Sequence, residues 1–129
     1  MTFADQLKRD AIRLCSKRYW GEDIVYYLGG DVEADGRALE AIIDREPEVP
    51  SATEYNQPVK EYELSIPHDK TQGVLASELS PGHDLVDLVD EVGVLRRCTV
   101  TSVRSSDAGM IRLILRVGPE VEDEEEGEE

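Results

Sequence analysis

The stretch from Thr99 to Gly118, TVTSVRSSDAGMIRLILRVG, constrains the fold more than any other part of the sequence. Residues 110–117 alternate apolar side chains with mostly polar ones, which is the period of a half-buried strand. The residues Asp107–Gly109 are typical of a tight turn, and the valines Val100 and Val103 flank an expected register break or bulge. The pattern predicts an antiparallel hairpin that closes a small sheet or barrel.

Strand character extends over most of the remaining chain. The candidate strands are 23–28, 37–46, 61–69, 84–89, 94–103 and 110–117. In the third of them Tyr62, Leu64 and Ile66 are expected to point inward. Residues 46–60, with three prolines and no periodicity, and residues 69–83 are expected to be long connections. The fold class predicted is mainly β: a small antiparallel β-barrel or sandwich of about six strands with long loops.

An N-terminal helix is expected over residues 2–18. Thr2 can cap it, with Asp5 three residues later as an acidic variant of the capping box. The apolar residues at helical spacing are Phe3, Leu7, Ala11, Leu14 and Cys15. This stripe is narrow for a core helix, so the helix is expected to dock loosely on its own sheet or to pack against another subunit.

The length of 129 residues suits one compact domain. Charge is unevenly distributed along it. The formal net charge is −15, and eight acids with no base lie in residues 120–129. The first twenty residues hold five bases against two acids, a net charge of +3. We therefore divide the chain into a basic amphipathic helix or arm (1–20), a β domain (21–118) and an acidic tail (119–129) that is expected to be disordered.

The charge also limits the classes of partner. A net charge of −15 argues against nucleic acid as a directly bound partner and against an anionic membrane surface. The first fifteen residues lack the apolar core of a signal peptide, so a location in a reducing cytoplasm is expected. Cys15 and Cys98 are too few for a disulfide framework and are expected to be buried free thiols.

Two acidic segments are candidate metal sites. Asp31–Gly36 resembles the start of an EF-hand loop, but its twelfth position is Ile42 where calcium needs a bidentate Glu. The acids of segment 84–91, next to His83, fit solvated positions at the ends of a strand better than a metal or acid–base site. We also find no nucleophile motif near His68 and no phosphate-binding glycine loop. We therefore expect no enzyme activity, catalytic residue, metal site or cofactor.

The order of these segments resembles a known family. The best-matching pieces are GRALEAIIDREP at Gly36–Pro47, the block at Asp69–Leu79 that contains TQGVLASEL, and the segment Arg96–Arg116 that begins RR and ends SSDAGMIRLILR. They are similar to the small head–tail joining proteins of long-tailed bacteriophages, of the lambda type. The resemblance covers about residues 1–118 and does not include the acidic tail.

The resemblance implies a virion structural protein that joins the DNA-filled head to the tail. Such a protein would form a neck ring of six copies, made in the host bacterial cytoplasm and located at the head–tail junction of the virion. Its neighbours would be portal or adaptor proteins on the head side and the tail terminator or tail tube on the other. DNA would pass through the ring without sequence-specific binding.

Contact residues are expected on two patches, because a head-to-tail ring needs two different surfaces on each copy. They are Phe3, Leu7, Arg9, Arg13, Leu14 and Arg18 on the helix, and Gly73, Val74, Leu75, Glu78 and Leu79 on the connection 69–83. Acids of the tail, Glu122, Asp123, Glu124, Glu125 and Glu126, could face the channel and repel DNA phosphate over about 8 Å.

Other functions remain open on the sequence. The net charge also fits an acidic DNA mimic that blocks a DNA-binding protein, although its acids concentrate in a tail and the basic helix would spoil the imitation. A tail-completion protein would have much the same pattern. A metal-dependent enzyme built on the acids of 84–91 is the third class, and it would require a tightly bound divalent ion.

Overall fold

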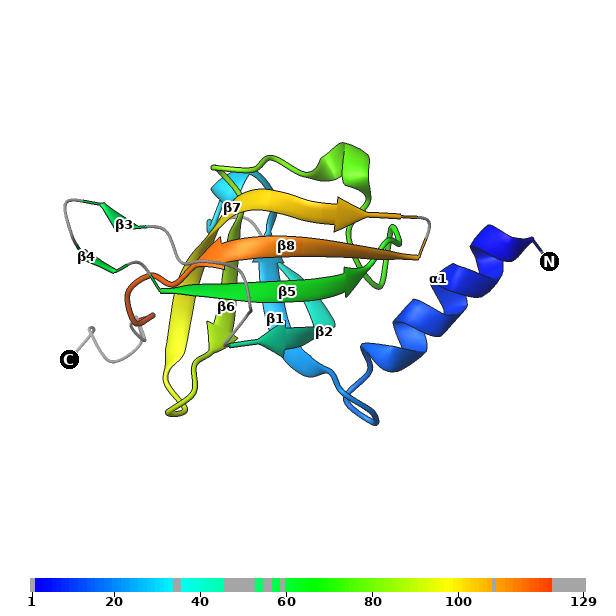
Figure 1. Ribbon diagram of the computed structural model, residues 1–129, viewed down its shortest axis with the longest axis horizontal. Coiled ribbons are helices and arrows are strands. Elements are labelled where there is room, and N and C mark those ends of the chain that lie inside the picture. The colour runs from blue at the N-terminus through cyan, green and yellow to red at the C-terminus, as the bar shows by residue number, and fades with distance from the viewer. Residues whose placement is uncertain are drawn as a thin grey trace.

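Six antiparallel strands close into one barrel, in the order β1-β2-β5-β8-β7-β6, in a computed structural model of the chain (Figure 1). The structure describes residues 2–33, 36–45, 53–54, 57–58, 60–107 and 109–121. The elements are α1 (Phe3–Leu14), β1 (Glu22–Tyr27), η1 (Leu28–Gly30), β2 (Arg37–Asp44), β3 (Thr53–Glu54), β4 (Gln57–Pro58), β5 (Glu61–Pro67), η2 (Ala76–Glu78), β6 (Leu85–Val89), β7 (Leu95–Ser106) and β8 (Met110–Arg116). This confirms the mainly β class and selects the barrel over the sandwich.

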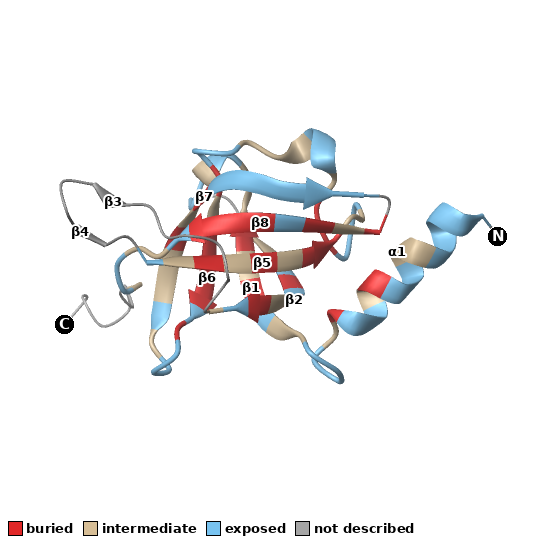
Figure 2. Ribbon diagram, viewed as in Figure 1, coloured by how far each residue is buried: buried red, intermediate tan, exposed pale blue. Residues whose placement is uncertain are grey.

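The barrel interior is filled by alternate residues of its strands (Figure 2). Tyr62, Leu64 and Ile66 of β5 are fully buried, as their alternation predicted. The other core residues are Ile24, Tyr26, Leu39, Ala41, Ile43, Val74, Val86, Leu88, Cys98, Val100, Ile111, Leu113 and Leu115. Because side chains of a strand alternate between its faces, the apolar positions of six strands meet once the sheet closes.

The β7–β8 hairpin contains the predicted irregularity. Its register shifts between Val100 and Ser102, and again between Val103 and Ser105. Each shift adds a residue to one strand only, which bends that strand and increases its twist. In this way residues 99–106 of β7 pair with the shorter stretch 111–116 of β8.

The N-terminal helix is shorter than predicted. Thr2 and Asp5 form the expected capping box, but the helix ends at Leu14, with Cys15 as its C-cap, instead of continuing to residue 18. Residues 15–20 turn back toward the barrel, and the N–H of Gly21 donates to the Ser16 carbonyl at 2.9 Å. A β-carbon at Gly21 would overlap the Cys15 carbonyl, so a glycine is required where the chain doubles back.

The connection 46–60 is predicted to be irregular throughout, but the structure places two short strands in it. The strands β3 and β4 pair with each other inside it, in register Thr53 with Pro58 and Glu54 with Gln57. The rest of this predicted loop lies outside the described residues, apart from Lys60. The two-residue strands lack an alternating pattern long enough for sequence periodicity to detect.

Three of the four acids of segment 84–91 are buried, which corrects the expectation that they are solvated, while Glu91 is exposed as expected. Asp84 is 0% exposed and Asp87 and Asp90 are 6% exposed. Each carboxylate has partners: Asp87 accepts from Arg97 at 2.8 and 2.9 Å, and Asp90 accepts from Arg96 at 3.0 Å. Burial of a carboxylate is tolerated when charge and hydrogen bonds compensate it, and such long-range partners are not visible in the local sequence.

After β8 the described chain runs back beside the start of β7. The Arg97 N–H donates to the Pro119 carbonyl at 3.0 Å, and the Val121 N–H donates to the Leu95 carbonyl at 2.9 Å. Residues 119–121 of the predicted tail therefore lie against the barrel. The acids Glu122–Glu126, expected to face a channel, lie outside the described residues.

Candidate protein interaction surface

The helix α1 touches the barrel along only part of its length and projects away from it toward the N-terminus (Figure 1). Ala11 and Cys15 are its buried contacts, at 4% and 1% exposed. The Cys15 thiol lies 3.5 Å from the Ser65 carbonyl of β5, and burial raises the pKa of this thiol to about 11. One turn before Ala11, the Leu7 carbonyl approaches Gly109 so closely that a β-carbon on Gly109 would collide with it.

The apolar stripe predicted on the helix is split between a buried and an exposed edge. Phe3 is 78% exposed and Leu14 is 43% exposed, while Leu7 is half-buried (Figure 2). At 100° per residue Phe3 and Leu14 lie almost in line, about 60–80° from Ala11. The exposed edge presents two apolar side chains about three turns apart on a partly docked helix, where a partner can reach both.

The polar face of α1 and the turn after it carry cations without acid partners. Arg9, Arg13 and Arg18 are exposed, and within the described part of the chain no acceptor or acid engages their guanidinium groups. By contrast, Lys17 is 2.9 Å from Asp23. The three arginines expected as contact residues are thus accessible in the folded chain, and their role as contacts stays a prediction.

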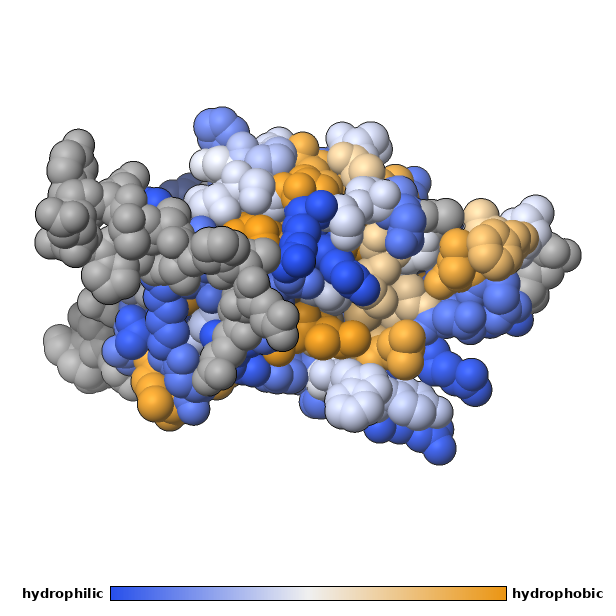
Figure 3. All heavy atoms as spheres, viewed as in Figure 1, coloured by the Kyte–Doolittle hydropathy of each residue, from blue (hydrophilic) through white to orange (hydrophobic). Residues whose placement is uncertain are grey.

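Two aromatic residues next to the helix were missed by the sequence reasoning. Tyr19 is 50% exposed and Trp20 is 71% exposed, in the turn that leads from α1 to β1. Exposed Trp and Tyr are the residue types most enriched in binding hot spots. The sequence offered one signal for these two residues, which is their position directly after a basic helix. In the space-filling view, hydrophobic side chains are visible between the barrel and α1 and toward the free end of the helix (Figure 3).

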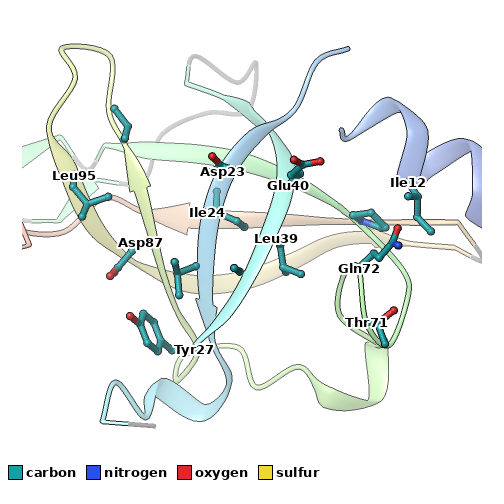
Figure 4. A pocket seen from close by; sticks show the side chains of 14 residues that line it. Ile12, Asp23, Ile24, Tyr27, Leu39, Glu40, Thr71, Gln72, Asp87 and Leu95 are labelled. Carbon is teal, nitrogen blue, oxygen red and sulfur yellow. The ribbon is translucent and has the colours of Figure 1, made fainter. Parts of the chain in front are cut away.

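A groove of about 820 Å³ lies on the outer face of β1 and β2. It runs from Leu95 of β7 across β1 and β2 to Ile12 of α1 (Figure 4). The apolar lining includes Ile12, Val25, Tyr27, Ala38, Val89 and Leu95. The alternation that sends Ile24 and Tyr26 into the core sends Val25 and Tyr27 into this groove.

Acidic side chains accompany the apolar lining of this groove. Asp23 and Glu40 lie beside its middle, and Asp87 lies toward its Leu95 end (Figure 4). Arg97 binds Asp87 and stacks 5.4 Å above the ring of Tyr27, which holds this ring in position. The groove therefore suits a segment that presents apolar side chains together with positive charge.

The predicted second contact patch, residues 73–79, is largely built into the monomer. Val74 is 0% exposed and belongs to the barrel core, and Gly73 is buried. Arg37 of β2 donates to the Gly73 carbonyl at 2.9 Å and to both Glu78 carboxylate oxygens, at 3.1 and 3.2 Å. Gly73 and Val74 thus have a structural role here. Contact of this segment with a partner stays a prediction.

The loop 68–79 covers a place where the barrel is incompletely paired. Strand β2 pairs with β5 only through residues 42–44. His68 fixes the loop: its Nδ1 lies 2.6 Å from the Asp107 carbonyl, and its Nε2 accepts from the Ala76 N–H at 3.1 Å. Because these contacts hold the loop against the barrel, Val74 reaches the core although its segment has no strand or helix periodicity.

Among the residues that the structure describes, no group of three or more His, Cys, Asp or Glu side chains is placed to hold a metal ion. In the same residues no helix is both long and apolar enough to cross a bilayer. Comparison of the chain with protein-family models, with curated proteins and with solved structures finds no match. The candidate functional site is therefore defined by its surface: the exposed edge of α1 with its following turn, and the groove over β1 and β2.

Proposed function

We propose that this chain is a head–tail joining protein of a long-tailed bacteriophage. It would act without chemistry, as a neck component that links the portal or adaptor side of the DNA-filled head to the tail terminator or tail tube. The copies would form a ring of six at the head–tail junction, assembled from protein made in the host cytoplasm.

The observation that carries the proposal is the presence of two different, unlike surfaces on one copy. One is the exposed edge of α1 with Phe3 and Leu14, and the other is the apolar groove that includes Val25 and Tyr27. A ring of identical subunits needs such a pair, because each copy must offer one surface to the copy before it and another to the copy after it. The helix of one copy would occupy the groove of the next.

Charge supports the same arrangement. Glu40 lies in the groove beside Asp23, which Lys17 already pairs at 2.9 Å, and the helix carries Arg9 and Arg13 on its exposed side. Opposite charge around an apolar contact steers the correct docking and disfavours the contact of two like surfaces. The receiving surface in this proposal is the groove, so the segment 73–79 is free to keep its structural role.

The overall charge suits a ring around a DNA channel. With a formal net charge of −15, the assembled ring would repel phosphate, so DNA would slide through it without being bound. The acids of residues 122–126 would contribute if they faced the channel.

The test is deletion of this protein from its phage, followed by electron microscopy of the lysate. Filled heads beside finished but unattached tails are the expected result, and emptied heads would add a stopper role. Tails with unfinished ends would indicate tail completion instead. Normal virions would overturn the structural role and favour the acidic DNA mimic.

A further inference from the structure

One histidine joins two segments that are far apart in the chain. His68 directly follows β5, and its Nδ1 lies 2.6 Å from the Asp107 carbonyl on the β7–β8 turn. On the other side of the ring, Nε2 lies 3.1 Å from the backbone nitrogen of Ala76, the first residue of η2. The imidazole of His68 therefore bridges η2 and the β7–β8 turn.

The two partners of the ring determine where its hydrogen lies. A carbonyl oxygen can only accept a hydrogen bond, so Nδ1 must carry a hydrogen to contact Asp107. A backbone N–H can only donate, so Nε2 must offer a lone pair to Ala76. Only the neutral ring with its hydrogen on Nδ1 meets both requirements.

A second proton on the ring would preserve one contact and remove the other. In an imidazolium both ring nitrogens are donors, so Nδ1 would still donate to the Asp107 carbonyl, in a bond that the charge strengthens. The new hydrogen on Nε2 would face the Ala76 N–H, which places a donor against a donor. Imidazole groups change charge between about pH 5 and pH 8. Acid should therefore separate Ala76 from the ring and leave the β7–β8 turn in place.

The contact to Ala76 holds down segment 75–79, which carries two half-buried leucines, Leu75 and Leu79. Leu79 packs against the barrel core. Glu78 of the same segment is tied to β2 by an ion pair of 3.1 Å, which does not involve the histidine. Loss of the histidine contact would therefore loosen the segment and expose its leucines without detaching it completely.

The chain before this segment is held independently of the imidazole. Val74 is fully buried in the core, and its N–H donates to the Pro67 carbonyl at 3.1 Å. Further upstream, the Asp69 carboxylate accepts from the Gln72 N–H at 2.8 Å and closes a local turn. Opening would thus be confined to residues 75–79, while the first half of the loop stays on the barrel.

The charged groups around His68 keep their charge over the same pH range. They are Asp69, Lys70 and Glu78 on its own loop, Asp107 on the β7–β8 turn, Lys8 of α1, Arg37 of β2 and Arg112 of β8. Backbone N–H groups lower the pKa of Asp69 and Asp107, and Arg37 lowers the pKa of Glu78. Lysine and arginine stay charged throughout. Proton uptake at this contact between pH 8 and pH 5 therefore falls on the imidazole.

We propose that His68 is a pH-sensitive latch on segment 75–79. With a neutral ring the latch is closed, Ala76 is held, and the leucines of the segment lie half-buried against the barrel. With a second proton the latch opens, and Leu75 and Leu79 become accessible to a partner. The latch is a property of the single chain, so its test does not depend on the ring of the proposed function.

NMR of the 15N-labelled full chain tests the latch directly. At pH 8 the ring nitrogens of His68 should show the hydrogen on Nδ1. Between pH 8 and pH 5, the protection of the Ala76 N–H against hydrogen exchange should fall by about threefold to tenfold, as expected for one lost hydrogen bond. Protection is taken relative to the intrinsic exchange rate at each pH. The N–H of His68 itself, which donates to the Gly109 carbonyl at 3.0 Å, is the internal control and should keep its protection.

Proteolysis of the full chain measures opening of the segment. A glutamate-specific protease should cut after Glu78 about threefold to tenfold faster at pH 5 than at pH 8, relative to its cut after the exposed Glu91, because cleavage follows the population of the open segment. His68→Gln cannot take up a proton, so its ratio should be the same at both pH values. His83→Gln is the matched control: it removes the other histidine, at an exposed position before β6, and should keep the pH dependence of the unchanged protein.

Several results would overturn the latch. One is a hydrogen on Nε2 at pH 8, and another is equal protection of the Ala76 N–H at pH 8 and pH 5. A cleavage ratio that keeps its pH dependence in His68→Gln would assign the opening to a different group. If the N–H of His68 lost protection together with that of Ala76, the loop and the turn would open as one unit and no local latch would exist. If His68→Gln failed to fold, the NMR titration of the unchanged protein would still decide.

Discussion

The Tyr26 hydroxyl donates a 2.6 Å hydrogen bond to Asp84, and neither side chain is more than 1% exposed. The N–H groups of Gly29 and Ser80 donate to the same carboxylate, at 2.6 and 2.9 Å. Burial, and then the adjacent carboxylate, raise the pKa of Tyr26 far above its ordinary value. The pair joins β1 to the segment that leads into β6, 58 residues later, at the seam where these strands close the barrel.

Removing this hydrogen bond should destabilise the barrel. We expect Tyr26→Phe to lower the free energy of unfolding by about 1.5–3 kcal/mol, because the acceptor is charged. Asp84→Ala should cost more, because the buried Tyr26 hydroxyl and two backbone N–H groups lose their acceptor together. Urea denaturation measures both. Tyr19→Phe is the matched control, since Tyr19 is half exposed and its change should stay within about 0.5 kcal/mol. Equal effects at Tyr26 and Tyr19 would contradict this assignment.

Stability should fall in acid through Asp90. Hydrogen bonds from the Val94 N–H first, and then from Arg96 and the Val92 N–H, lower the pKa of this buried carboxyl to about 2. Its ordinary pKa is about 3.9, so the unfolded chain takes up the proton first as the pH falls. The stabilisation is complete above about pH 4 and is lost toward about pH 2. Asp90→Asn should be less stable at pH 7 and lose less stability between pH 4 and pH 2. Equal losses in the two proteins, measured by denaturation at each pH, would contradict this role.

The two cysteines should report whether α1 stays docked. Cys15 is 1% exposed and its pKa is raised to about 11, so little reactive thiolate is present at neutral pH. We expect Ala11→Asp, which places a charge between helix and barrel, to speed alkylation of Cys15 by about tenfold or more, because local opening of the helix then needs less free energy. The rate at Cys98, inside the barrel, should not change. Peptide mass spectrometry measures both rates, and a parallel rise at both would indicate that the whole barrel opens instead.

Truncation of the exposed edge of α1 should abolish ring assembly and leave the monomer folded. Phe3 is 78% and Leu14 is 43% exposed in the single copy, so Phe3→Ala with Leu14→Ala removes little contact within the monomer and much of the proposed contact between copies. Complementation of the deletion phage and thermal denaturation measure the two effects. Val92→Ala is the control, because Val92 is 76% exposed but lies on the β6–β7 turn. If rings still form, the role given to the helix is wrong.

Local sequence determined most of the strands and the helix start. The period of two in β5 and β8 follows from the alternation of side chains along any strand, so Tyr62 and Leu64 could be assigned to the interior without knowing their neighbours. The capping box of Thr2 and Asp5 spans four residues and was equally visible. The helix end at Leu14 was missed, because the turn after it depends on docking against the barrel.

The candidate surface was visible only in part. The basic and apolar residues of α1 stood out from their helical spacing, but the spacing could not tell which edge of the stripe would stay exposed, since that depends on where the barrel touches the helix. The groove over β1 and β2 was not predicted at all. Its lining comes from α1, five strands and the loop after β5, and Val25 and Leu95 come together in it only when the sheet is formed.

The sequence by itself determined that this chain makes a small antiparallel β fold with a separate, basic N-terminal helix, because these properties rest on periods and caps of a few residues. Tertiary structure decided that Asp84 is buried and not solvated, and that Val74 fills the core and not a surface. The physical reason is that burial depends on partners such as Tyr26, which are distant in the chain and are brought close only by closure of the barrel.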